Sequence, residues 1–183
     1  SRQKDKARQA GKFKIETKDV HWNTLSDGNH SEFIGYEHLE SQSKVIKYAE
    51  TDNGFLVVLD KTPFYAEAGG QVADKGAIKS NGIDLEVVDV QKDNDMIIHA
   101  CKGSVKSWKN ANTVTCKADG NNRDPIKRNH TATHLLHAAL KTVLGNQVHQ
   151  TGSLVHPDYL RFDLTYFEKI TSEQIRKIED LVN

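Results

Sequence analysis

The chain has 183 residues, 25 of them basic and 25 acidic, and 37% of its residues are hydrophobic. This balance excludes a wholly disordered chain, a collagen-like or coiled-coil array, and a histone-like protein that coats nucleic acid along its whole length. The longest apolar runs, such as 55–59, are far shorter than the roughly 18 residues of a transmembrane helix, and no signal peptide opens the chain, so we expect a cytosolic protein without a membrane partner.

The first 18 residues are strongly basic, with seven Lys or Arg against two acidic residues. Because they are also polar and free of Pro, we interpret them as a basic helical linker, which either contacts phosphates or is simply solvated. Met96 is the only methionine, and the stretch after Thr171 looks like a helix cut in mid-pattern. We therefore expect the chain to be an excised piece of a longer protein.

Short segments rich in Val and Ile, separated by turns such as Asp-Asn-Gly and Ser-Asn-Gly, predict a small closed or half-open β-barrel over residues 19–120. The predicted strands are Lys44–Glu50, Phe55–Leu59, Gln71–Ile78, Ile83–Val90, Met96–Ala100 and Thr113–Ala118.

A second region over 121–183 combines helices with strands. Apolar residues at three- and four-residue spacing predict a helix over 125–144, begun by Asp124 and Pro125 and ended by Gly145. Two strands follow, at 147–155 and 159–165. A last helix starts near Thr171 with a capping box, and we expect its apolar face (Ile175, Ile178, Leu181 and Val182) to be exposed if further strands are needed to cover it.

The polar side of the first helix carries three imidazoles. His130, His134 and His137 fall within about 60° of one another, and the i, i+4 spacing of His130 and His134 lets both reach one tetrahedral metal ion. Thr131 stands where a zincin has the Glu that acts as general base, so we do not expect a zinc protease. Two ligands do not close a zinc site. The candidates for the others are His137, His149, His156, Cys101, Cys116, or residues beyond Asn183.

Two further segments are candidates for binding. Gly69 and Gly70 leave bare backbone that a ligand can approach, although Gly-Gly pairs are also common in plain hairpin turns. The segment 150–153 has small and hydroxylated side chains. It is either part of a binding pocket or simply the edge of an ordinary strand.

Four segments, DKTPFYAEAGGQVADKG (60–76), RNHTATHLLHAAL (128–140), QTGSLV (150–155) and LRFD (160–163), resemble the editing region of alanyl-tRNA synthetases and their freestanding relatives in order and spacing. The similarity runs from about Arg2 to Asn183. The basic opening and the segment 31–36 resemble the synthetases rather than the freestanding editors. The resemblance implies an α+β fold, in which a β-barrel is followed by a truncated two-layer α/β editing domain with a long HxxxH helix, shared with threonyl enzymes.

The same resemblance implies roles for individual residues. His130 and His134 would be zinc ligands, and the other two would come from a downstream CxxxH motif, which neither Cys101 nor Cys116 provides. The implied catalytic residues are Thr133, Gln150 and Ser153, and the implied substrate-binding residues are Thr62, Gly69, Gly70 and Arg161. Two alternatives remain for Arg161: it forms an ion pair with Asp163, or it simply lies on the exposed face of a strand.

The implied function is hydrolysis of serine or glycine from mischarged tRNA(Ala), a second sieve that is needed because a pocket for alanine rejects these two amino acids weakly. The implied partners are the aminoacylated 3′ end of tRNA(Ala) and the remaining domains of the synthetase. ATP and Mg²⁺ would serve a charging core that nothing in this chain resembles. The alternative is a module that positions tRNA or another domain and has an inert metal site. A freestanding editor is disfavoured because the chain lacks an initiator Met.

Overall fold

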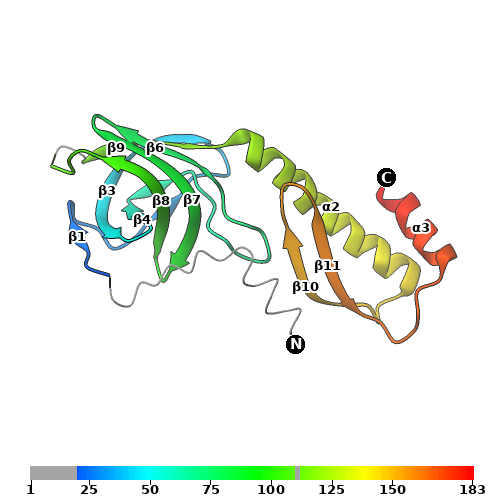
Figure 1. The fold of residues 1–183 in the computed structure, drawn as a ribbon. Coiled ribbons are helices and arrows are strands. Elements are labelled where there is room, and N and C mark those ends of the chain that lie inside the picture. Colours follow the sequence, from blue (N-terminus) through cyan, green and yellow to red (C-terminus); the bar gives the residue numbers. More distant parts are fainter. Residues whose placement is uncertain (1–19, 110–111) are drawn as a thin grey trace.

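In the computed structural model, which describes residues 20–109 and 112–183, a β-barrel is followed by a long helix, a two-stranded sheet and a second helix (Figure 1). The predicted α+β class and the predicted barrel are confirmed. The basic linker predicted over 1–18 lies outside the described residues.

Six antiparallel strands close the barrel in the order β3-β4-β8-β7-β6-β9, and β9 pairs back with β3. The long strand β3 makes closure possible because its first part pairs with β9 and its second part with β4, with a bulge at Ile46. The barrel strands are β3 (Glu40–Thr51), β4 (Gly54–Leu59), β6 (Gly76–Ser80), β7 (Ile83–Asp93), β8 (Met96–Val105) and β9 (Thr113–Ala118). The short strand β1 (Asn23–Thr24) pairs antiparallel with β3, and β2 (Glu32–Phe33) pairs in parallel with β5 (Lys61–Thr62).

The barrel interior is filled by alternating side chains. In β7, Ile83, Leu85 and Val87 are buried while the residues between them are exposed, as expected for a strand with one face inward. Strand β4 instead reads as a continuous apolar run, because Leu56 and Val58 pack outside the barrel against Trp22 and neighbouring strands. Both faces of β4 are therefore buried.

Helix α2 (Gly120–Leu144) begins five residues before the predicted start. The prediction of an Asp124 cap is wrong: the cap is Asp119, whose Oδ1 accepts the N–H of Asn121 at 2.9 Å. Pro125 lies inside the helix, in its second turn, and has no N–H to donate to the carbonyl of Asn121 one turn earlier. Gly145, with a φ of 87°, ends the helix as predicted.

The strand predicted at 71–78 is also partly wrong, since regular pairing starts only at Gly76. The reason is that the carboxylate of Asp74 accepts the N–H of Tyr65 at 2.6 Å and the side chain of Arg123, which holds this segment as a loop.

The second region packs around α2. Strands β10 (His149–Val155) and β11 (Leu160–Thr165) form a hairpin along the helix, and α3 (Ser172–Val182) packs near its C-terminal end (Figure 1). The predicted capping box of Thr171 and Gln174 is present. Leu140, Leu144, Val148 and Ile178 form the buried core of this region.

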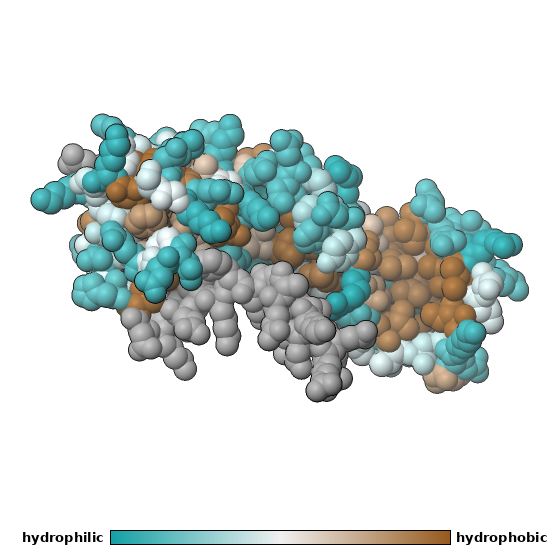
Figure 2. Space-filling view, viewed as in Figure 1, coloured by the Kyte–Doolittle hydropathy of each residue, from teal (hydrophilic) through white to brown (hydrophobic). Residues whose placement is uncertain are grey.

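Part of the apolar face of α3 is exposed. Ile178 is buried, whereas Ile175 and Leu181 are 46% and 55% exposed. Figure 2 shows hydrophobic side chains gathered over the part of the molecule that α2, the hairpin and α3 form. In the described part of the chain, no helix combines the length and apolarity needed to cross a membrane.

A histidine lies in the barrel core. His99 is fully buried, with Nδ1 at 2.9 Å from the carbonyl oxygen of Val57 and Nε2 at 2.8 Å from the hydroxyl of Thr62. A carbonyl oxygen only accepts, so Nδ1 carries the proton and Nε2 accepts from Thr62. Burial lowers the pKa of His99 to about 4, and the bond to Val57 offsets a part of this shift.

We predict that this histidine makes the barrel sensitive to acid. Between the ordinary pKa of 6.5 and the folded value of about 4, the unfolded chain binds a proton that the folded chain does not. The free energy of unfolding should therefore fall by roughly 3 kcal/mol as the pH drops from 7 to 4. Denaturant unfolding followed by tryptophan fluorescence at several pH values measures this, and His99→Leu should be less stable at pH 7 but lose this part of the pH dependence. An unchanged pH dependence in the variant would contradict the assignment.

Candidate functional site

A pocket of about 90 Å³ lies where a loop of the barrel meets α2 and the β10–β11 hairpin. Most of the residues that the sequence predicts for the site are found here. The lining residues are Gly69, His130, Thr133, His134, His137, Gln150, Ser153, Val155 and Phe162.

The two predicted zinc ligands point at each other. His130 and His134 lie one turn apart on α2, and their Nε2 atoms are 3.1 Å apart. On its other side, Nδ1 of His130 lies 2.8 Å from Oε1 of Gln71, a residue of the barrel. Both histidines are exposed to solvent, so a ligand can reach both Nε2 atoms.

The barrel loop reaches the site through a tight turn. The backbones of Ala68 and Gln71 are hydrogen-bonded to each other in both directions, at 2.9 and 3.3 Å, and the two residues between them are Gly69 (φ 59°) and Gly70 (φ 85°). The carbonyl of Gly70 accepts the N–H of Val155 at 2.8 Å, and a Cβ on Gly70 would lie 2.5 Å from the carbonyl oxygen of Ser153. Only glycine permits this close approach.

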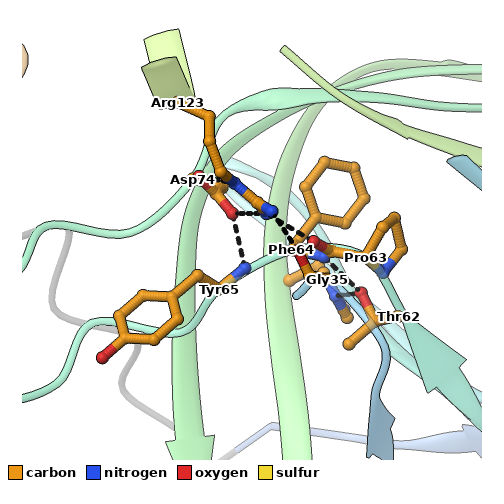
Figure 3. Close-up of polar contacts among 8 residues, drawn as sticks. Gly35, Thr62, Pro63, Phe64, Tyr65, Asp74 and Arg123 are labelled. Atoms are coloured by element: carbon orange, nitrogen blue, oxygen red, sulfur yellow. Dashed lines mark hydrogen bonds and ion pairs between the residues drawn. The ribbon is translucent and has the colours of Figure 1, made fainter. Parts of the chain in front are cut away.

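A buried ion pair joins the start of α2 to the barrel (Figure 3). The Nε atom of Arg123 donates to Asp74 at 3.0 Å, and its Nη2 makes a second contact with the same carboxylate. The remaining donors of the guanidinium bind the carbonyl oxygens of Gly35 and Pro63, each at 2.5 Å. Sequence reasoning missed both charged residues, although Asp74 lies within one of the segments that carry the family resemblance.

A bulge in β10 explains how two of its residues reach one pocket. Gln150 and Ser153 are three positions apart, so in a regular strand they would face opposite sides. The pairing register with β11 shifts between Gln150 and Gly152, and this irregularity brings both side chains to the pocket. Thr133 faces them from α2, with its hydroxyl donating to the carbonyl of Asn129 at 2.7 Å.

The structure places two predicted binding residues elsewhere. Thr62 is fully buried in the barrel, where its hydroxyl donates to His99 and accepts the N–H of Phe64 at 3.2 Å. Arg161 lies on β11 and pairs with Asp163, with Nη2 at 3.1 Å from Oδ2, as one of the alternatives anticipated. Neither residue belongs to the lining of the pocket in the described part of the chain, and of the two predicted glycines only Gly69 does.

The other residues considered as metal ligands lie apart from the histidine pair, except for His137. Cys101 and Cys116 lie in the barrel core, and burial raises the pKa of Cys116 to about 12, so neither thiol reaches the histidine pair. His149 and His156 are not among the lining residues, whereas His137 lines the pocket and packs against Phe162 at 5.3 Å between ring centroids. Over residues 20–109 and 112–183, no three His, Cys, Asp or Glu side chains converge on one point.

Comparisons with known proteins point to one family. The family model described as tRNA synthetases class II (A) matches residues 1–122. The alanine–tRNA ligase of Cytophaga hutchinsonii is 41% identical over 99% of the chain, and that of Bacteroides thetaiotaomicron is 43% identical over 99% of it. The ligase of Fusobacterium nucleatum is 46% identical over 84% of the chain. The chain spans about a fifth of the length of these relatives.

We predict a large loss of stability from breaking the ion pair at the start of α2. Arg123→Met leaves the carboxylate of Asp74, which is 1% exposed, without its partner and should cost about 3–5 kcal/mol in denaturant unfolding. The double variant Arg123→Met/Asp74→Leu should recover a large part of this cost because no charge is left buried. A cost below about 1 kcal/mol for the single variant would show that the pair does not hold the helix.

The two glycines of the turn make a matched pair of variants. Both have positive φ, but an added Cβ meets Ser153 only at Gly70, while at Gly69 no atom lies within 4 Å. Gly69→Ala should therefore cost only about 1–2 kcal/mol of backbone strain, and Gly70→Ala should in addition push the turn away from β10. Amide hydrogen exchange at Val155, whose N–H binds Gly70, measures the displacement. Equal protection of Val155 in the two variants would contradict the contact.

Proposed function

The chain belongs to the alanine–tRNA ligase family, and from this premise we propose that its pocket hydrolyses serine or glycine from mischarged tRNA(Ala). The observation that carries the proposal is the convergence of His130 and His134 with the polar side chains of Thr133, Gln150 and Ser153 on one small pocket. ATP- and Mg²⁺-dependent alanylation is proposed for other parts of the ligase.

The histidine pair fits a zinc ion. In a tetrahedral site with Zn–N distances of about 2.0–2.1 Å, neighbouring nitrogen atoms are roughly 3.4 Å apart, close to the 3.1 Å between the two Nε2 atoms. His130 and His134 would hold the ion together with ligands that the described residues do not include. A zinc ion held by these residues would supply a Lewis acid to the pocket.

The reaction itself is the hydrolysis of an ester. The oxygen of water forms a bond to the ester carbonyl carbon, the bond from that carbon to the ribose oxygen breaks, and the ribose oxygen takes up the proton that the water gives up. Gln150 and Ser153 lie together on one side of the pocket, so an amide and a hydroxyl are available to orient the water or the substrate. This requires no movement of the strand, because the bulge already turns both toward the pocket.

Thr133 would recognise a donor on the substrate. Its proton is committed to the carbonyl of Asn129, so its hydroxyl offers only lone pairs to the pocket. The hydroxyl of a seryl ester can donate to these lone pairs, whereas the methyl group of an alanyl ester cannot. An alanyl side chain would leave the lone pairs of this nearly buried oxygen without a donor, and that penalty favours serine over alanine.

A second candidate is a module that positions tRNA or a neighbouring domain. The observation in its favour is that no third metal ligand joins the histidine pair within the described residues, which leaves the metal site incomplete.

We predict that the full-length ligase releases serine from Ser-tRNA(Ala) much faster than alanine from Ala-tRNA(Ala). His134→Ala and Gln150→His should each lower release of serine by at least about 100-fold, because each alters a group that faces the pocket. The matched control is His149→Ala, a nearby exposed histidine of β10 that does not line the pocket. Release of labelled serine and zinc content should be measured for the ligase and for the 183-residue chain.

Two results would contradict the proposal in different ways. Full activity of both variants would remove the site assignment. No release of serine by the wild-type ligase would remove the editing reaction and favour the positioning module.

A further inference from the structure

We infer that Gln71 is a positioning residue that holds His130 in the tautomer protonated at Nδ1, so that its bare Nε2 faces the pocket. The inference about the ring stands on the contacts of the chain itself. What Nε2 then binds, a divalent cation of the zinc type, rests on the proposed function.

The hydrogen bond settles which nitrogen is protonated. Oε1 of Gln71 lies 2.8 Å from Nδ1 of His130, and a carboxamide oxygen only accepts, so Nδ1 is the donor. In this tautomer, Nε2 of His130 carries a lone pair and no proton. Because Nε2 of His134 lies 3.1 Å away, it must be the protonated partner in that contact. The two rings therefore take opposite tautomers in the chain without metal.

The backbone of Gln71 is fixed by neighbouring hydrogen bonds, so its side chain can hold His130 in one tautomer. Its backbone closes the tight turn with Ala68, and the residues on either side of it, Gly70 and Val72, are both hydrogen-bonded to the backbone of Val155, at 2.8 and 3.1 Å. The side chain thus starts from a backbone that β10 fixes on both sides. Little further ordering is needed to make the bond to His130.

The contact gives the barrel a direct part in the site. Gln71 is 59 residues before His130 in the sequence and belongs to the barrel loop, whereas His130 belongs to α2. Histidines that bind metals almost always donate their second ring N–H to a fixed acceptor, and loss of that acceptor typically weakens metal binding 10- to 100-fold. A neutral amide serves as this acceptor without adding a negative charge beside the pocket.

The first test reads the tautomer directly. Long-range ¹H–¹⁵N NMR of the imidazoles, recorded on the 183-residue chain at about pH 8, above the ordinary range of histidine titration, should show His130 protonated at Nδ1. Gln71→Glu keeps the acceptor and should keep this tautomer, while Gln71→Leu should lose it. Protonation of His130 at Nε2 in the unaltered chain, or an unchanged tautomer in Gln71→Leu, would overturn the inference.

Another histidine serves as a control in the same spectrum. His99, buried in the barrel, donates from Nδ1 to the carbonyl oxygen of Val57. It should therefore appear protonated at Nδ1 in the unaltered chain and in both variants. A Gln71 variant that misfolds would change this signal too and is thereby recognised.

The second test measures metal affinity without any enzymatic activity. Zn²⁺ alone, titrated into the chain and followed by the Nε2 signals of His130 and His134, should bind 10- to 100-fold more weakly to Gln71→Leu than to the unaltered chain or to Gln71→Glu. The control is Gln42→Leu, an exposed barrel glutamine that bonds Thr115 instead. Equal affinity of Gln71→Leu and Gln42→Leu would overturn the positioning role. Failure of the ligase to release serine would leave the tautomer result intact and overturn only the editing proposal.

Discussion

The junction between the barrel and α2 depends on one buried interaction, the ion pair of Arg123 and Asp74. The guanidinium also binds the carbonyl oxygens of Gly35 and Pro63, so three separate segments of the barrel region hold the first turn of the helix. A helix rises about 1.5 Å per residue, so His130 follows about 10 Å farther along, two turns beyond the fixed point. Fixing Arg123 therefore determines where the histidine pair can lie relative to the barrel.

A second junction closes the site from the other side. The turn at Gly69 and Gly70 is bonded to β10, and Asn129 of α2 donates to the carbonyl oxygens of His156 and Pro157 in the turn after β10. The barrel loop, the helix and the hairpin are thus each tied to the other two. The hydrogen bond between Gln71 and His130 is a contact between the barrel loop and the helix in this arrangement. Because both elements are also held by the hairpin, a single amide can orient a ring on a different element.

Local patterns predict the parts that depend on local chemistry. Alternation of Val and Ile predicts most barrel strands, and the spacing of His130 and His134 places both rings on one face of α2. The missed features depend on distant partners. The helix starts at the cap residue Asp119, whose N–H donates to the carbonyl oxygen of Lys75 at 2.8 Å. The loop at Asp74 is held by Tyr65 and Arg123. Thr62 turns inward because it satisfies the buried His99. A single sequence does not show that Arg123 is the partner that Asp74 requires.

The composition of the pocket bears on what it can hold. The residues that line it in the described part of the chain include imidazole, hydroxyl and amide groups but no carboxylate. A carboxylate there would repel the phosphate-rich end of a tRNA and would pair with the amino group of any aminoacyl ester, whatever its side chain. Without a carboxylate, binding depends more on directed hydrogen bonds, such as one to the hydroxyl of Thr133, whose own proton is already donated to Asn129. In the editing reaction that we propose, selection between serine and alanine would then depend on which side chain can donate to the lone pairs of Thr133.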